Sequence, residues 1–401
     1  MADALQTTRD PQPSAGTGVG AMLHLIRDGR ATTRAELVAL TGLARSTVAQ
    51  RMDALLAQRL VVPAGSSAST GGRPPKTYAF NRGAGVVLAA DLGATHSRIA
   101  ITDLAGDVLV EARADIPIAD GPKAVLDWLE RTFGQLLDES GSDREAVRGV
   151  GVGVPGPVEF VTGTPVAPPI MPGWDGYPVA GHLGQIYSAP VLVDNDVNLM
   201  ALGEHWARWR DNQHLLFVKV GTGIGCGVIT DGQIHRGAQG AAGDIGHIHV
   251  PDHDDVICRC GNVGCLEAVA GGGAMAAQLD AMGIPAENSR DVVRYVREGR
   301  PEAMRLVRQA GRELGGVLAS AVNFFNPSVI VVGGDIADAD EHLLAGVREV
   351  VYRRSTALAT RSIRIARSTL DDHAGVIGAA VMVIEAVLAP DAVDQAIAQA
   401  S

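Results

Sequence analysis

The sequence predicts a small, mainly helical N-terminal domain followed by a larger α/β body of two similar lobes. Residues 1–85 contain ten Lys/Arg and five Asp/Glu, and the other residues contain 24 and 40, so the two parts carry charges of +5 and −16. In the body, a strand, a Gly-Thr turn and a second strand follow one another at two separate places. A chain of 401 residues also exceeds the usual size of one hydrophobic core.

Composition places the chain among globular proteins. Apolar residues make up 46% of it, yet no run of about eighteen apolar residues occurs, so we expect no membrane span. The N-terminus lacks the apolar segment of a signal peptide, and the first eighteen residues are typical of a disordered lead-in. We therefore expect a cytoplasmic protein whose basic N-terminal part is suited to polyanions such as DNA.

The N-terminal part is predicted to contain three helices. An apolar stripe runs through residues 20–28, and Thr33 with Glu36 forms a capping box for a short helix over 34–40. The third helix, 45–59, turns Val48 and Met52 inward. It leaves outside the side chains that would bind DNA, namely Arg45, Ser46, Thr47, Gln50 and Arg51. This pattern indicates a helix-turn-helix with a polar recognition helix, although a solvated helix face would use the same residue types.

A wing follows the third helix. Val61 and Val62 begin a strand, residues 77–80 form its return, and S-S-A-S-T-G-G-R-P-P-K lies between them. The glycine-flanked ribbon presents Arg73 in a form that fits an A·T-rich minor groove. The alternative is a linker with an incidental arginine. The winged helix-turn-helix domain is expected to span residues 1–82.

The body begins with a strand at 86–91, the turn D-L-G-A-T-H-S-R, and strands at 99–103 and 108–112. Gly93 and Thr95 offer N–H and hydroxyl donors to a phosphate, and Asp91 could orient a metal or a water. The theme returns after the strand 215–220 and continues to a strand near Ile234. The glycine turn of this second copy consists of Gly221, Thr222, Gly223 and Gly225. The repeat predicts two similar lobes that close on a ligand.

Between the two copies we expect a helix at 123–137, a strand at 149–154 and a strand at 191–193 that runs into D-N-D-V-N. The last motif opens a helix through residue 209. Asp196 could act as a general base and Asn195 could fix a neighbouring hydroxyl, because strand ends are where α/β sheets present chemistry. Helix capping by the same residues is an equally good interpretation.

Residues 244–267 predict a metal site. His247, Cys258, Cys260 and Cys265 lie within nineteen residues, and three of the four cysteines of the chain fall within eight. A Cys3His set suits a closed, structural Zn²⁺ site, whereas His249 and His253 are weaker candidates. Ordinary buried cysteines are the alternative.

The remainder is predicted to be mostly helical, with helices at 273–282, 289–298, 301–325, 341–353 and 376–388. A strand at 329–332 meets the turn of Gly333 and Gly334, where a flat nucleobase could lie against bare backbone. The two lobes are expected to span residues 83–197, completed by a C-terminal helix at 389–401, and residues 198–388, which hold the zinc site.

Together these motifs resemble the ROK family of repressors, open reading frames and sugar kinases, over nearly the whole chain. The resemblance rests on D-L-G-A-T at 91–95, D-N-D-V-N at 194–198, G-T-G-I-G at 221–225, G-D-I-G-H at 243–247 and C-R-C-G-N-V-G-C-L-E at 258–267. It implies an actin-like body (the ribonuclease H-like fold of sugar kinases) whose zinc site supports a sugar pocket. The wing sequence S-T-G-G-R-P-P also resembles that of the DNA-binding members.

The resemblance implies that sugar hydroxyls contact Asn195, Asp196, His247 and Glu267, and that Gly153 with the Pro155-Gly156 loop lines the cleft. Asp244 replaces the glutamate usual in the family at another sugar contact. The expected function is a sugar-responsive repressor that binds operator DNA as a homo-oligomer, a dimer or a tetramer. The alternative is an ATP- and Mg²⁺-dependent sugar kinase with Asp196 as base, or a protein with both functions, since Asp91, Gly93 and Thr95 remain.

Overall fold

The computed structural model describes residues 18–66, 76–94, 96–339 and 341–400, and it divides into two compact units. The first unit contains the described residues up to Val86 together with Asp103–Asp107 and the C-terminal segment from Ile384. The second contains Val87–Thr102 and Val108–Val383. Arg73, predicted to bind DNA, and Thr95, predicted to bind phosphate, lie outside the described residues.

The first unit confirms the helix-turn-helix. Its helices are α1 (Val19–Arg27), α2 (Arg34–Thr41) and α3 (Arg45–Ala57), followed by the antiparallel strands β1 (Val61–Ser66) and β2 (Lys76–Phe80). The capping box forms as expected, with the Thr33 hydroxyl accepting from the Glu36 N–H and the Glu36 carboxylate accepting from the Thr33 N–H. Gly42, in the left-handed conformation, ends α2 and starts the turn into α3.

The C-terminus differs from the expectation. The predicted C-terminal helix, α14 (Pro390–Gln399), packs against α1 of the first unit instead of completing the first lobe. Asp394 Oδ1 accepts a hydrogen bond of 2.8 Å from the Gly20 N–H. A Cβ at Gly20 would lie 2.1 Å from the Pro390 carbonyl oxygen, so the glycine permits this close approach.

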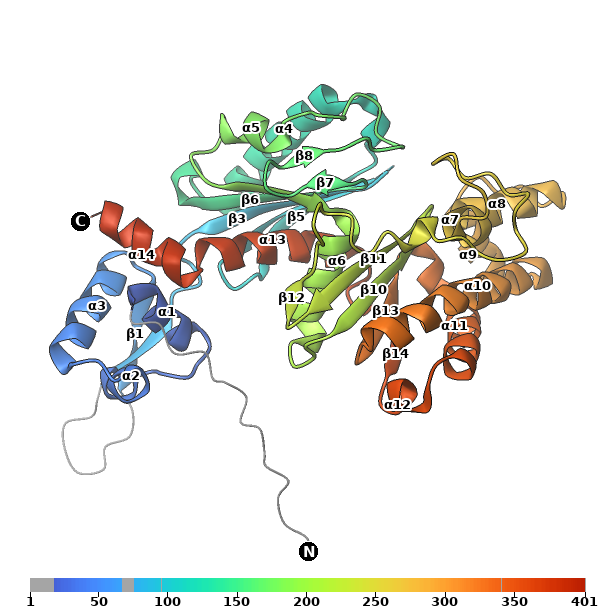
Figure 1. Cartoon of the computed structure of the whole chain (residues 1–401). Coiled ribbons are helices and arrows are strands. Elements are labelled where there is room, and N and C mark those ends of the chain that lie inside the picture. Colours follow the sequence, from blue (N-terminus) through green and yellow to red (C-terminus); the bar gives the residue numbers. More distant parts are fainter. Residues whose placement is uncertain (1–17, 67–75, 95, 340, 401) are drawn as a thin grey trace, which may run out of the picture. The chain divides into compact units, whose positions relative to one another are not determined.

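The second unit contains two five-stranded sheets, one in each lobe (Figure 1). The first sheet has the order β5-β4-β3-β6-β9. Its strands are β3 (Val86–Leu92), β4 (Ser97–Asp103), β5 (Val108–Ala114), β6 (Val147–Val154) and β9 (Val191–Asn195). The second sheet has the order β12-β11-β10-β13-β14. Its strands are β10 (Leu215–Val220), β11 (Ile224–Thr230), β12 (Gln233–Ile234), β13 (Val329–Gly333) and β14 (Arg364–Arg367).

Both sheets use one topology. Numbered along the chain within each sheet, the strands run 3-2-1-4-5 in both, and the two outer strands on one side pair in parallel. The predicted repeat therefore extends beyond the hairpins at the start of each lobe to all five strands. The short strand β14 was not expected from the sequence, because R-I-A-R offers only one buried apolar residue.

Two helices lie between the sheets. α6 (Asp196–Glu204) packs on β10 and β11, and α13 (Ala374–Val387) packs on β6. The two helices cross at Gly378, where an added Cβ would lie 1.8 Å from the Leu199 carbonyl oxygen. After α6 the chain continues in a π-helical turn to Trp209.

The other helices of the second unit lie around the two sheets (Figure 1). In the first lobe these are α4 (Pro122–Ser140) and α5 (Val179–Gly184), beside a small hairpin of β7 (Val158–Glu159) and β8 (Thr164–Pro165). In the second lobe they are α7 (Leu266–Ala270), α8 (Gly272–Ala281), α9 (Ser289–Arg297), α10 (Pro301–Phe325), α11 (Glu341–Arg354) and α12 (Ala357–Thr360). α10 and α11 pack along each other over the main apolar core.

Among the described residues, no single helix has the length and apolar character needed to cross a membrane. The segments Asp371–Val387 and Pro390–Gln399 meet that criterion only as a pair, with a bend of 59° between them.

Candidate functional site

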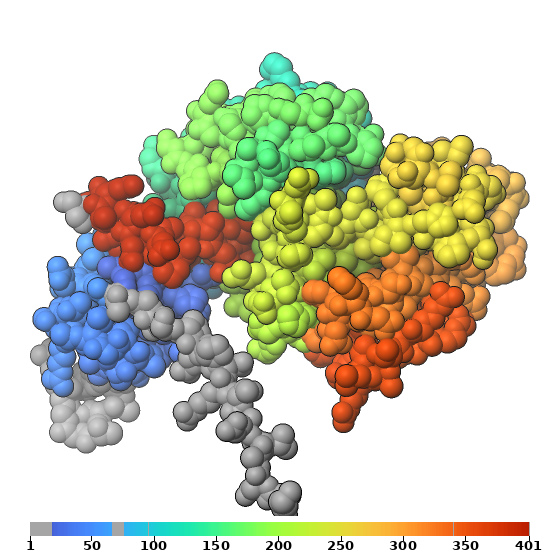
Figure 2. Space-filling model, in the orientation of Figure 1, coloured from blue at the N-terminus to red at the C-terminus, as the bar shows by residue number. Residues whose placement is uncertain are grey.

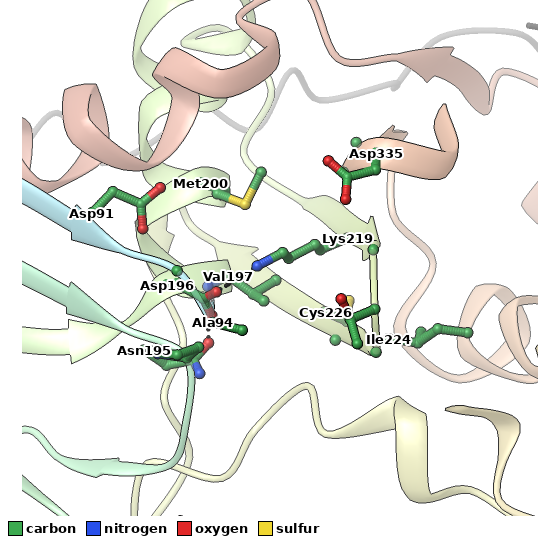
Figure 3. Close-up of a pocket in the computed structure, with 18 of the residues that line it drawn as sticks. Asp91, Ala94, Asn195, Asp196, Val197, Met200, Lys219, Ile224, Cys226 and Asp335 are labelled. Carbon is green, nitrogen blue, oxygen red and sulfur yellow. Dashed lines mark hydrogen bonds and ion pairs between the residues drawn. The ribbon is translucent and has the colours of Figure 1, made fainter. Parts of the chain in front are cut away.

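A cavity of about 490 Å³ lies where the central strands of the two sheets end. Residues that follow β3 and β10 line it, together with the start of α6 (Figure 3). The cavity gathers the predicted sugar- and nucleotide-site residues that the structure describes, apart from Gly153. These are Asp91, Gly93, Asn195, Asp196, Gly221, Thr222, Gly223, Gly225, Asp244, His247, Glu267, Gly333 and Gly334.

Gly153 has a different place from the expected one. It does not line the cavity, whereas Pro155 and Gly156 do. A Cβ at Gly153 would lie 2.8 Å from the Leu199 side chain and 3.3 Å from Asp91 Oδ1. The absence of a side chain at Gly153 therefore makes room for Asp91 and α6.

The residues of the motif D-N-D at the end of β9 have different roles, some in capping α6 and some in lining the cavity. Asn195 caps α6, since its Oδ1 accepts from the Val197 N–H at 2.9 Å while its Nδ2 donates to the Gly156 carbonyl at 3.0 Å. Asp194 accepts from the Asn195 N–H, from Asn198 Nδ2 and from Arg236 Nε. Asp196 makes no cap bond, so it is the carboxylate of this motif that remains for the cavity.

Lys219 is the partner of Asp196, and it was missed from the sequence. Its Nζ lies 2.5 Å from Asp196 Oδ2, and only 5% of the Asp196 side chain is exposed. Burial opposes the charge on Lys219, but the Asp196 and Asp91 carboxylates outweigh this effect and raise the pKa of Lys219. A single lysine within the otherwise apolar strand L-L-F-V-K-V was the available signal.

Asp91 faces the same space without a hydrogen-bond partner on its enclosed Oδ1. Burial raises the pKa of Asp91 to about 7, and the nearby Asp196 charge adds to the rise. The glycine turns beside it are less open than expected. The Gly93 N–H donates to the His96 carbonyl at 2.9 Å and the Gly221 N–H donates to the Gly223 carbonyl at 3.0 Å, so neither donor is free for a phosphate.

At the second-lobe side, Glu267 and His247 connect the cavity to the cysteine loop. Glu267 accepts from the Ile224 N–H at 3.1 Å, which fixes its carboxylate beside the glycine turn. His247 turns Nδ1 toward Cys258 Sγ, at 3.6 Å, and Nε2 toward Asp244 Oδ1, at 3.9 Å. One ring edge of His247 therefore meets the cluster while the other faces the cavity.

His247, Cys258, Cys260 and Cys265 form a group that could hold a metal ion, because their ligand atoms all lie within 4.8 Å of one another. Cys260 and Cys265 Sγ are 3.7 Å apart. These separations fit a tetrahedral zinc ion, whose sulfur ligands at roughly 2.3 Å stand about 3.8 Å from each other. Figure 2 shows the loop, in yellow, at the surface of the second lobe.

The rival histidines lie outside this group. His249 pairs with Asp254 at 2.8 Å, and His253 Nε2 lies 3.8 Å from Glu313. Gly261 and Gly264 both have positive φ, 90° and 65°, as the expected fold-back of the loop requires.

In the first unit, α3 exposes Arg45, Ser46 and Gln50, whereas Thr47 and Arg51 are half-buried. Val48, Met52 and Leu55 hold the opposite side of α3 in the core. The polar face predicted to read DNA is thus mostly available to solvent.

Comparisons with known proteins agree with this architecture. The family model described as "ROK family" matches residues 87–386. A putative xylose repressor from Caldicellulosiruptor sp. (strain Rt8B.4) is 32% identical over 92% of this chain and 96% of its own.

Two solved structures extend the comparison. The structure of a ROK family transcriptional regulator, a homologue of the E. coli MLC protein, matches with a TM-score of 0.80 and 24% identity. The match covers 95% of this chain and 98% of that one, and shows a common fold. A ROK hexokinase from Thermus thermophilus is 32% identical with a TM-score of 0.63, over 74% of this chain and 97% of its own, so sugar kinases are also relatives. The family model matches the body, the two similar sheets end at one cavity, and the similarity to a repressor extends over most of the chain. These findings show that this chain belongs to the ROK family.

Proposed function

We propose that this protein is a sugar-responsive transcriptional repressor that binds operator DNA through its first unit and a sugar in the cavity of its second. One observation carries the proposal: a helix-turn-helix with an exposed polar face on α3 stands in the same chain as a polar ligand cavity. The relative named as a repressor is similar over 92% of this chain, whereas the hexokinase matches only 74%.

The charges of the cavity favour a neutral ligand. Eight Asp/Glu and five Lys/Arg line it, so a phosphorylated sugar would enter a space with an excess of negative charge. Carboxylates, amides and imidazoles that face the cavity suit the hydroxyl groups of an unmodified sugar. The ligand class is therefore an uncharged aldose or its N-acetyl derivative, and Asp196, Asp244, His247 and Glu267 are the proposed contacts.

The ion proposed for the cysteine cluster is Zn²⁺. Four ligands, three of them thiolates, leave no open position, which is typical of a structural site. Bound zinc would fix the loop and the ring of His247, and through them the wall of the sugar site.

Operator binding is proposed to involve a homodimer that spans two half-sites, with α3 of each copy in the major groove. Arg45, Ser46, Thr47, Gln50, Arg51 and Arg73 are the proposed DNA contacts. Since operator DNA lies in the cytoplasm, the protein is proposed to work there.

The test of this function is binding of the purified protein to the DNA upstream of its own gene, followed by fluorescence anisotropy at several salt concentrations. We expect sequence-selective binding that weakens with salt, by about 0.9 in the log–log slope per neutralised phosphate, and that changes when sugar is added. The panel includes xylose, glucose and N-acetylglucosamine. Binding that is equally strong on unrelated DNA, or none at all, would contradict the assignment.

The zinc proposal has its own test. Cys260→Ser should remove the bound zinc, measured by elemental analysis, and weaken the sugar-induced rise of the melting temperature. Cys226→Ser is the matched control for zinc content, because Cys226 is a buried thiol outside the cluster. Cys226 lines the cavity, so this control is not used for the sugar response. If the protein keeps its full sugar response without zinc, the cluster only stabilises its own loop.

A sugar kinase is the second candidate, and the similarity of the second unit to a ROK hexokinase favours it. In that case Asp196 would be the general base and ATP with Mg²⁺ the co-substrate, with Gly333 and Gly334 near the nucleobase. A coupled assay with ATP and the same sugars, with Asp196→Asn as control, separates the two functions.

A further inference from the structure

Lys219 occupies the centre of the cavity between carboxylates from both lobes. Its side chain leaves the end of β10 and reaches Asp196 Oδ2 at 2.5 Å, with Asp91 on the far side and Asp335 near its own strand (Figure 3). The strand that carries it is held on both edges, since Lys219 lies opposite Gly225 of β11 and Gly333 of β13. The ammonium group is thus a fixed part of the cavity.

The carboxylates around Lys219 keep its positive charge in place. The charges of Asp196, Asp91 and Asp335 all favour the protonated amine, and the pKa of Lys219 is raised despite its burial. Asp335 is held in turn by the Ser289 hydroxyl, at 2.6 Å. Asp196 is therefore already paired with a cation that the protein supplies itself, and the charges of Asp91 and Asp335 favour that cation.

A nucleotide bound with a divalent ion would need these same carboxylates. Mg²⁺ demands six oxygen ligands in near-octahedral order and is usually held by one or two protein carboxylates and by phosphate oxygens. An ammonium bonded to Asp196 takes that carboxylate and repels a second cation nearby. The closed Gly93 and Gly221 donors further reduce what the cavity offers to a phosphate chain. The residues present thus do not fit a magnesium–nucleotide complex.

We propose that Lys219 is the resident cation of this cavity and takes the place of a divalent ion between Asp196 and Asp91. Its charge thereby limits the site to a neutral sugar that binds without a magnesium nucleotide. Lys219 is accordingly a specificity-determining residue. The proposal concerns the same cavity as the proposed function, but its readout involves neither DNA nor sugar, so the two can fail separately.

The test is the binding of Mn²⁺, alone and with ATP, to zinc-loaded full-length protein, followed by the electron paramagnetic resonance signal of free Mn²⁺. We expect the wild type to bind no Mn²⁺ through Asp196 up to millimolar concentrations. Lys219→Met, which removes the charge and keeps a long side chain, should bind Mn²⁺ at least tenfold more tightly. The gain should disappear in Lys219→Met with Asp196→Asn.

Two controls keep the outcome clear. Lys123→Met removes a lysine whose side chain is 81% exposed, and Lys219→Arg retains the charge; neither should gain Mn²⁺ binding. Wild-type binding of Mn²⁺ that Asp196→Asn abolishes would overturn the proposal, as would a folded Lys219→Met protein without any gain. If Lys219→Met fails to fold, as judged by zinc content and melting curve, the comparison of wild type with Asp196→Asn decides alone.

Discussion

Asp91 is a carboxyl group whose ionised form the fold disfavours. Its pKa lies at about 7 in the folded protein against 3.8 for the free side chain, because burial and the Asp196 charge both oppose ionisation. Its Oδ1 has no hydrogen-bond partner, and a Cβ at Gly375 would lie 2.0 Å from its Oδ2. The folded state therefore holds a proton that the unfolded chain has already released between about pH 4 and pH 7.

This difference sets the sign of a pH effect. Stability is lost as pH rises from about 4 through 7, by roughly 4 kcal/mol at full effect, because ionising Asp91 is harder in the folded state. Asp91→Asn should remove this loss. The melting temperature of the variant relative to that of the wild type should therefore be higher at pH 8 than at pH 5. Calorimetry at the two pH values measures it, and a difference that stays constant with pH would contradict the assigned pKa.

Prediction from sequence was limited at single residues by contacts between distant segments. His247 and the three cysteines could be grouped because they lie within nineteen residues. Lys219 and Asp196 are 23 residues apart and meet only because α6 packs on β10. In the sequence Asp194 suits a helix cap as well as Asn195 and Asp196 do, but in the structure it pairs with Arg236, whose Cζ lies 3.6 Å from the centre of the Phe160 ring.

Among the elements, α3 supports a prediction on DNA binding. Arg45→Ala should weaken operator binding by about 1 to 3 kcal/mol, roughly tenfold to a hundredfold, because the guanidinium of a recognition helix contacts a base edge or a phosphate. Anisotropy at fixed salt measures the change. Arg30→Ala is the control, since Arg30 is an exposed arginine of the same unit outside α3. Equal losses in both variants would mean that only general positive charge matters.

Two glycines form a matched pair, Gly243 before the metal cluster and Gly261 within its loop. Gly243 and Gly261 have nearly equal φ, 93° and 90°, but a Cβ at Gly243 would lie 1.8 Å from the Cys226 carbonyl oxygen, whereas Gly261 faces open space. Gly261→Ala should cost about 1 to 2 kcal/mol for the backbone conformation alone. Gly243→Ala adds the overlap with β11, so its melting temperature should fall by several degrees more. Equal melting temperatures for the two variants would refute this reading of the loop.

Elements with strong local signals were predictable and those without were not. Pro301 at the first helical position and an amphipathic pattern place α10 over residues 301–325, as expected. β14 and the hairpin of β7 and β8 depend instead on neighbouring strands, since R-I-A-R and a Pro/Gly-rich segment carry little strand preference. The position of α14 also followed from a contact, that of Asp394 with Gly20, which no local pattern indicates.

At the scale of the whole molecule, the repeated sheet order brings equivalent strand ends of the two lobes to one cavity. Strands 1 of the two sheets, β3 and β10, both end at the cavity, so each lobe contributes a turn and a charged side chain to it. A ligand bound there contacts both lobes, and its free energy of binding favours whichever arrangement of the lobes fits it better. A sugar can thus act on the body as a whole through a few polar contacts.

Such a ligand must affect DNA binding and be affected by it to the same extent. If sugar changes the operator Kd by a given factor, saturating operator DNA must change the sugar Kd by that factor, and couplings of about 5- to 150-fold are typical. Sugar at 100 times its Kd should also stabilise the protein by about 2.7 kcal/mol, measured as a higher melting temperature. Asp196→Asn should lose this stabilisation and still bind operator DNA, now without a response to sugar. Stabilisation by sugar with an unchanged operator Kd would show that the cavity binds its ligand without control over the DNA-binding unit.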